Sequence, residues 1–178
     1  MILVIGTPDS GKSALAENIA VEKSQGKRMA YIATMIPYGD EGKNRIGRHK
    51  KLREGKNFIT FEEPYSVSNI LHETKNMNIE TALLECVSNL VGNVSHTVEN
   101  LEKDKKSLIE ALFLDIKNAS DEIKNLVVVA NNFEINSEYD EDTVRYIEIN
   151  NSVNERLKTI AEMYVVKEGN EWIYYDNN

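Results

Sequence analysis

The residues that most clearly suggest chemistry form the run Gly6-Thr7-Pro8-Asp9-Ser10-Gly11-Lys12-Ser13, which matches the pattern G-x-x-x-x-G-K-[ST]. Its glycines let the backbone turn tightly and point N–H groups inward, an arrangement that surrounds phosphate oxygens. Lys12 can reach the β- and γ-phosphates, and the hydroxyl of Ser13 is a ligand for Mg²⁺. We therefore predict that this loop binds a nucleoside triphosphate.

The flanking residues supply the strand and the helix that this motif requires. Residues 1–5 are apolar and mostly branched, which suits one buried strand. Residues 14–20 combine good helix formers with apolar residues at helical spacing. The N-terminus of such a helix adds positive potential beside bound phosphates. This context argues against a glycine-rich turn that matches the pattern by chance.

A cluster of basic residues further along the chain surrounds one histidine. Seven of the 21 Lys and Arg residues lie between Lys43 and Lys56, in a chain whose formal net charge is −8. On a helix, Arg45 and His49 share a face because they are four residues apart. A neutral imidazole among cationic groups is a competent nucleophile towards phosphorus, since the cations screen an anionic substrate. From charge alone, a solvated helix face with an inert surface histidine stays open as the alternative.

A carboxylate follows the apolar stretch at residues 80–84. Residues 80–84 predict a buried strand, and Glu85 comes directly after it. Ligands bind at the carboxyl ends of the strands in open α/β sheets. An acid there can hold Mg²⁺ directly or through water, so we predict a metal site made by Ser13 and Glu85. A plain residue at a strand end is the alternative.

Strands and helices alternate along the whole chain. The predicted strands cover residues 1–5, 29–34, 58–61, 80–84, 126–130, 164–166 and 172–175. The predicted helices cover residues 14–20, 40–51 with Asp40 as N-cap, 65–73, 94–124 and 143–163. The pattern predicts an α/β P-loop NTPase fold of the RecA-like kind, with three layers and a mostly parallel sheet. We expect residues 1–178 to form a single P-loop nucleotide-binding domain.

Composition excludes several classes of protein. Hydrophobic residues make up 41% and charged residues 28% of the chain, as in ordinary globular proteins. The net charge of −8 argues against a general nucleic-acid binder. One cysteine, Cys86, excludes an internal disulfide framework, and no run of residues is apolar enough to span a membrane. With a strand already at Met1, we expect no leader peptide and a cytoplasmic location.

Several motifs together resemble one family, the bifunctional adenosylcobinamide kinase/adenosylcobinamide-phosphate guanylyltransferases of cobalamin biosynthesis. The resemblance begins with the phosphate loop and continues through the most specific block, Y-I-A-T at residues 31–34 followed by R-I-x-x-H at residues 45–49. Further matches are Asp40-Glu41, Glu62-Glu63-Pro64, Leu83-Leu84-Glu85-Cys86 with Asn89 and Asn93, and V-N-x-R-L at residues 153–157.

The resemblance implies an activity and a set of site residues. The family phosphorylates adenosylcobinamide, with GTP or ATP as substrate and Mg²⁺ as cofactor. It then transfers GMP from GTP to adenosylcobinamide phosphate through a guanylylated histidine, which matches His49 here. By the same resemblance, His49 and Lys12 are catalytic and the family assembles as a homotrimer. The nucleotide site is implied to include Thr34, Met35, Ile36, Lys50, Lys51, Leu52, Arg53, Glu62 and Glu85 in addition to residues 6–13.

Three features depart from the family pattern. Asp9 stands in the phosphate loop where the family usually has a basic residue, and an anion beside phosphates is unfavourable unless it faces solvent or a metal. Residues 130–134 lack the family's glycine and proline, and Ile147-Glu148 replaces an Arg-Asp pair. Two further hypotheses therefore stay open: a divergent P-loop kinase that kept one activity, and a GTP-binding regulatory protein without turnover.

Overall fold

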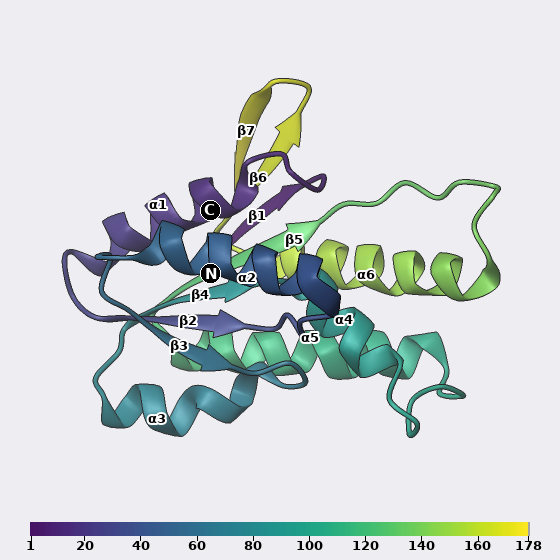
Figure 1. Cartoon of the computed structure of the whole chain (residues 1–178), viewed down its shortest axis with the longest axis horizontal. Helices are drawn as coiled ribbons and strands as arrows, with labels where there is room; N and C mark the ends of the chain where they lie inside the picture. The colour runs from purple at the N-terminus through teal and green to yellow at the C-terminus, as the bar shows by residue number, and fades with distance from the viewer. Residues whose placement is uncertain (178) are drawn as a thin grey trace.

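Seven strands form one twisted sheet in the computed structural model, which describes the backbone of residues 1–177 and the side chains other than those of Glu41, Lys43, Arg45 and Leu52. The strands are β1 (Ile2–Gly6), β2 (Met29–Ala33), β3 (Phe58–Glu62), β4 (Thr81–Glu85), β5 (Asn125–Asn131), β6 (Met163–Glu168) and β7 (Glu171–Asp176). Their order across the sheet is β3-β2-β4-β5-β1-β6-β7 (Figure 1). All neighbours are parallel except β6 and β7, which form an antiparallel hairpin at one edge.

Helices cover both faces of this sheet, which gives the predicted three-layer α/β architecture (Figure 1). The helices are α1 (Lys12–Ser24), α2 (Gly39–Arg53), the 3-10 helix η1 (Val67–Ile70), α3 (Leu71–Asn76), α4 (Val87–Ser95), α5 (Lys105–Glu122) and α6 (Glu141–Ile160). Helix α1 packs on β1, β2, β4 and β5 on one face. Helices α4 and α5 pack against α6 and β5 on the other.

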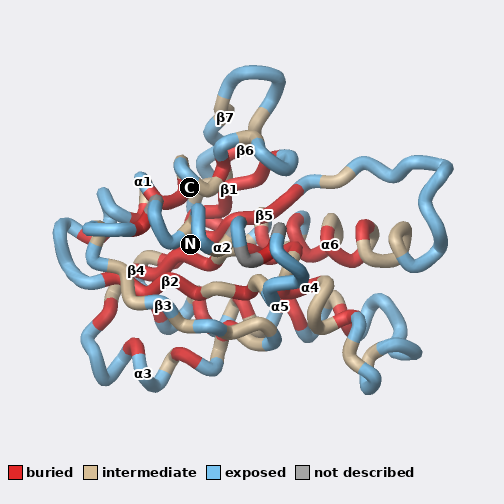
Figure 2. Tube along the Cα trace, in the orientation of Figure 1, coloured by how far each residue is buried: buried red, intermediate tan, exposed pale blue. Residues whose placement is uncertain are grey.

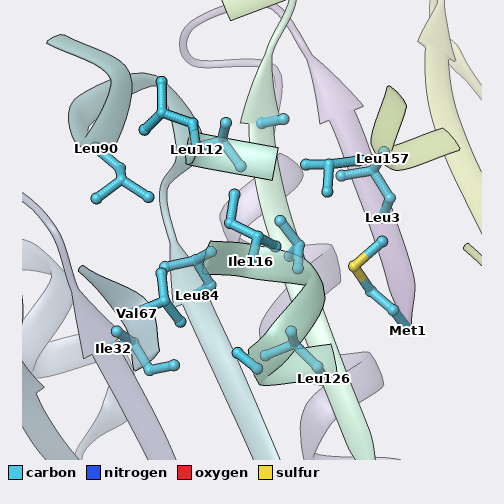
Figure 3. Close-up of a cluster of buried hydrophobic side chains, with 14 of the residues drawn as sticks. Met1, Leu3, Ile32, Val67, Leu84, Leu90, Leu112, Ile116, Leu126 and Leu157 are labelled. Carbon is cyan, nitrogen blue, oxygen red and sulfur yellow. The ribbon is translucent and has the colours of Figure 1, made fainter. Parts of the chain in front are cut away.

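The alternation of side chains along each strand divides the core between the two faces. Val4, Leu83 and Val129 belong to the cluster packed with Ala16 and Ala20 of α1. The larger cluster lies on the opposite face and contains Leu3, Ile32, Leu84, Leu90, Leu112, Ile116, Leu126 and Leu157 (Figure 3). Because the central strands are buried on both faces, they are apolar without interruption (Figure 2). None of the helices in the described part of the chain is long and apolar enough to cross a membrane.

The structure corrects the expected start of the second helix. Helix α2 begins at Gly39, so Asp40 lies inside its first turn and is not the N-cap. The N-cap is Tyr38, whose side chain makes no capping hydrogen bond with the described residues. A carboxylate at the position of Asp40 still complements the positive end of the helix.

The predicted helix over residues 94–124 is wrong in its extent. Helix α4 already begins at Val87 and ends at Ser95, and α5 begins only at Lys105. Asp104 starts α5 as its N-cap, since its carboxylate accepts a hydrogen bond from the Ser107 N–H at 2.9 Å. Leu101, which lies within the predicted range, is in the connecting turns and is 56% exposed.

The last helix shifts by two to three residues. Asp140 accepts a hydrogen bond from the N–H of Thr143 and so begins α6 at Glu141. The helix ends at Ile160, and Met163 belongs to β6. The predicted helix over residues 65–73 is replaced by η1 and α3, because the carboxylate of Asp115 on α5 accepts hydrogen bonds from the N–H groups of Val67 and Ser68.

Candidate active site

The phosphate loop connects β1 to α1, and residues that tolerate a left-handed backbone occupy its left-handed positions. Asp9 and Gly11 adopt left-handed backbone angles, with φ of 58° and 87°. A side chain at Gly6 would place its Cβ 2.5 Å from the Ser10 hydroxyl, which would have to move to make room. Lys12 is 4% exposed and its Nζ donates a hydrogen bond to the carbonyl oxygen of Thr7 at 3.1 Å. The lysine amine therefore lies over the loop that is expected to hold phosphates.

Asp9 is exposed to solvent, at the tip of the loop. Asp is among the residues that tolerate a left-handed backbone, which accounts for its presence at this position. The expected conflict between an anion and the bound phosphates is therefore reduced, because water can solvate this carboxylate.

Ser13 and Glu85 meet across the sheet. The Ser13 hydroxyl donates a hydrogen bond of 2.7 Å to Oε1 of Glu85, although the two residues are 72 positions apart. Glu85 ends β4, and β5 lies between β4 and β1. Within the described residues, no group of three or more His, Cys, Asp or Glu side chains could hold a metal ion alone. A hydroxyl and one carboxylate instead suit Mg²⁺, which takes its other ligands from water and phosphates.

A cavity of about 300 Å³ adjoins this pair and lies under α2. Its lining comes from β2, the segment after it, α2, β3 and the end of β4: Tyr31, Ala33, Met35, Pro37, Ile46, His49, Lys50, Arg53, Thr60, Glu62, Glu85, Cys86 and Asn89. Glu85 thus belongs both to the cavity and to the pair with Ser13. His49, partly buried, faces the same space.

One basic residue of this cavity is fixed by an aromatic ring. The guanidinium carbon of Arg53 lies 3.4 Å from the centroid of the Tyr31 ring, and Arg53 is 8% exposed. Its Nη2 also approaches the hydroxyl of Thr60 at 3.4 Å. Burial, and then the nearby Glu85 carboxylate, raise the pKa of Tyr31 well above its usual value, so its ring stays neutral. A neutral ring face stabilises the buried cation.

Thr34 holds the ends of β2 and β4 together. Its hydroxyl accepts a hydrogen bond from the N–H of Cys86 at 2.7 Å and donates one to the carbonyl oxygen of Cys86 at 2.8 Å. Asn93 on α4 donates to the carbonyl oxygens of Thr34 and Pro64, at 2.7 and 2.9 Å. Thr34 is fully buried, so its hydroxyl serves this network and is not presented to the cavity.

The structure brings together many of the residues expected in the nucleotide site. Met35, His49, Lys50, Arg53, Glu62 and Glu85 line the cavity. Ile36 and Lys51 are exposed and are not part of its lining. The side chains of Leu52 and Arg45 lie outside the part that the structure describes.

Tyr31, Thr60 and Asn89 line the same cavity, although motif reasoning gave none of them a place in the site. Tyr31 and Thr60 are register partners on β2 and β3, a pairing that only tertiary structure defines. For Thr60, the sequence indicates only that a polar residue lies between the apolar residues Ile59 and Phe61 on β3.

The positions that depart from the family pattern have structural contacts of their own. Ile147 is 3% exposed and lies in the hydrophobic interior. Glu148 forms an ion pair with Lys105 at the surface. The segment at residues 132–140, between β5 and α6, is mostly exposed.

These features define a P-loop nucleotide-binding protein: a phosphate loop after β1, a carboxylate at the end of β4 with one strand between β4 and β1, and a mostly parallel sheet. The fold agrees with the solved structure of an ATPase domain, with a TM-score of 0.56 at 12% identity over 93% of this chain and 68% of that one. The family described as cobinamide kinase / cobinamide phosphate guanyltransferase matches residues 2–172, and the chain belongs to it. It is therefore a nucleotide-using transferase of phosphorus-containing groups in cobalamin biosynthesis. A comparison with the curated proteins finds no match.

Proposed function

We propose that the chain carries out both reactions of this family, with the phosphate loop serving the kinase step and His49 serving the guanylyl transfer. The observation that supports this proposal is the position of Glu85. It accepts a hydrogen bond from Ser13 at the phosphate loop and also lines the cavity that contains His49. The phosphate loop, assigned to the kinase step, is thus adjacent to the cavity with His49, assigned to the guanylyl transfer.

In the kinase step, the loop over residues 6–13 binds the triphosphate and Lys12 moves from the carbonyl oxygen of Thr7 to the β- and γ-phosphates. The N-cap of α1 is Gly11, which has no side chain to occupy the N–H groups of the first turn, so these can face the phosphates. Ser13 and Glu85 would hold Mg²⁺, which neutralises charge on the phosphates when bound. The hydroxyl of adenosylcobinamide then attacks the γ-phosphorus, and the nucleoside diphosphate leaves.

In the second step, an imidazole nitrogen of His49 attacks the α-phosphorus of GTP. A P–N bond forms, the bond from the α-phosphorus to the bridging oxygen breaks, and pyrophosphate leaves with that electron pair. Lys50 and Arg53 line the same cavity and stabilise the charge that develops on the phosphoryl oxygens. An oxygen of adenosylcobinamide phosphate next attacks the same phosphorus and breaks the P–N bond. The product is adenosylcobinamide-GDP.

Labelling with GTP that carries a radioactive α-phosphate tests this assignment. The protein should retain label that survives alkali and is lost in acid, as a phosphoramidate does. Labelling should decrease at low pH, because protonation removes the lone pair of the imidazole. His49→Ala should abolish the label and keep kinase activity, while His72→Ala, at an exposed position on α3, should label as the unchanged protein does. Persistent label in His49→Ala, or none in the unchanged protein with Mg²⁺, would contradict the proposal.

A GTP-binding protein or kinase without guanylyl transfer is a second candidate. The exposed segment at residues 132–140 without glycine or proline, and the structural use of Ile147 and Glu148, favour it. Under the main proposal, adenosylcobinamide should bind in the presence of a non-hydrolysable GTP analogue, more weakly than in typical members of the family. Calorimetric titration measures this, and no heat at high corrinoid concentration would favour the second candidate. The family resemblance also implies a homotrimer, which light scattering tests.

A further inference from the structure

Asn131 ends the strand that lies between the phosphate loop and Glu85. It is the last residue of β5, which lies between β1 and β4. In the register of the sheet, Asn131 is opposite Gly6, where the phosphate loop begins. Val129 is opposite Glu85. Asn131 therefore lies about 7 Å further along the strand direction than the level of Glu85, on the side where ligands bind.

The side chain of Asn131 is on the face of the sheet that α1 covers. Val127 and Val129 pack in the core cluster that includes α1, and side chains two residues apart on a strand share a face. Ser13 on α1 reaches Glu85 on β4, while the loop before α1 starts at β1. The loop and the first turn of α1 consequently pass over the end of β5, directly above Asn131.

The backbone of Asn131 is fixed from the opposite side by buried side chains. Its N–H donates to the hydroxyl of Ser88 at 3.1 Å, and that hydroxyl donates to Oδ1 of Asn150 at 2.8 Å. Asn150 and Asn154 on α6 both donate to the carbonyl oxygen of Asn131, at 2.9 and 2.8 Å. Asn150 is 0% and Asn154 2% exposed. This network positions the residue without using its side chain.

The amide group of Asn131 is buried without a partner for its oxygen. The residue is 8% exposed, and Oδ1 has no hydrogen-bond partner among the described residues. A buried amide oxygen without a partner destabilises the fold, so native proteins retain one mainly where a ligand or water completes it. Residues 126–130, which precede it on β5, are all apolar.

We infer that the side-chain amide of Asn131 contacts the reacting groups of phosphoryl transfer, an inference that rests on the proposed kinase step. Nδ2 donates a hydrogen bond to an oxygen of the γ-phosphate, and Oδ1 accepts one from the attacking hydroxyl. The new bond joins that hydroxyl oxygen to the γ-phosphorus, and the bond to the β,γ-bridging oxygen breaks with its electron pair on the leaving diphosphate. The hydroxyl proton passes to an oxygen of the transferred phosphoryl group, and the amide keeps its own protons. Asn131 therefore aligns nucleophile and electrophile.

Steady-state phosphorylation of adenosylcobinamide tests this role. Asn131→Ala should lower kcat about 100-fold, the cost of removing one well-placed hydrogen-bond donor. The KM for the nucleotide should change less than about threefold, since Lys12 and the loop supply ground-state binding. The hydrogen bonds through the N–H and carbonyl oxygen of Asn131 remain in the variant, so folding should be kept. Asn132→Ala, at the exposed neighbouring position, is the matched control and should behave as the unchanged protein does.

Asn131→Asp separates a chemical role from a structural one. It keeps the shape of the side chain but replaces the donor by an anionic oxygen facing phosphates, so kcat should fall at least as far as in Asn131→Ala. If Asn131→Ala and Asn131→Asp both kept the kcat of Asn132→Ala and of the unchanged protein, the inference would be overturned and the kinase step would stand. Losses confined to the nucleotide KM or to thermal stability would also overturn it. No phosphorylation by the unchanged protein would overturn the kinase step and this inference together.

Discussion

Replacing Thr34 by Val tests whether the link between β2 and β4 supports the site. The two side chains have nearly the same shape, so the change removes the hydroxyl with little effect on packing. The carbonyl oxygen of Cys86 keeps its hydrogen bond from the Leu90 N–H at 3.2 Å, but the Cys86 N–H loses the hydroxyl. One buried donor without a partner costs about 1–3 kcal/mol, and the second lost hydrogen bond adds about 1 kcal/mol. We therefore expect Thr34→Val to lower the free energy of unfolding by about 2–4 kcal/mol.

Urea denaturation measures this change, and Thr34→Ser provides the matched control. Ser keeps the hydroxyl and loses one methyl group, which costs about 1 kcal/mol. Because Glu85 precedes Cys86, Thr34→Val should also weaken binding of a GTP analogue in the presence of Mg²⁺, whereas Thr34→Ser should leave it nearly unchanged. The reasoning is refuted if Thr34→Val costs no more stability than Thr34→Ser.

Three further predictions concern the phosphate loop, a buried ion pair and the buried cysteine. Lys12→Ala should abolish binding of a non-hydrolysable GTP analogue in calorimetry, and unchanged affinity would contradict the assignment of the phosphate loop. Lys56→Met should lower the free energy of unfolding, measured in urea, by about 3 kcal/mol, because it leaves the Glu17 carboxylate, whose side chain is 3% exposed, without its cation. Glu17→Gln should cost less, because the Lys56 side chain is 35% exposed and its amine can turn to water. A larger loss for Glu17→Gln than for Lys56→Met would refute this reasoning. Burial raises the pKa of the Cys86 thiol to about 11, so stability should fall as the pH rises from about 9 through 11, and iodoacetamide at pH 8 should modify Cys86 in urea but not in the native protein.

Local patterns predicted the parts of the fold that depend on neighbouring residues. The phosphate loop and the apolar central strands follow from side-chain type and spacing, because each is determined within a few positions. The break between α4 and α5 was missed. Residues 96–104 contain neither glycine nor proline, and the local signal for the start of α5 is Asp104, whose carboxylate accepts hydrogen bonds from the N–H and hydroxyl of Ser107.

The candidate site was predictable only where a motif covers it. His49 and Glu85 were identified by type and position and Arg53 by the family resemblance, and the structure places all three around one cavity. The stacking of Arg53 on Tyr31 requires the end of α2 to lie over β2, which no local pattern encodes. The buried environment of Asn131 depends in the same way on α4 and α6, whose contributing residues are far apart in the sequence.

The order of the strands has a consequence for how the chain folds. In the described sheet, β1 pairs only with β5 and β6, so its first partner is more than a hundred residues away in sequence. Strands β2, β3 and β4 can assemble earlier, but they join β1 only through β5. Such distant pairing makes folding slow, because a long loop must close before any contact forms. The phosphate loop would thus acquire its shape late, so a growing chain on the ribosome should gain nucleotide binding only after β5 has been made and docked.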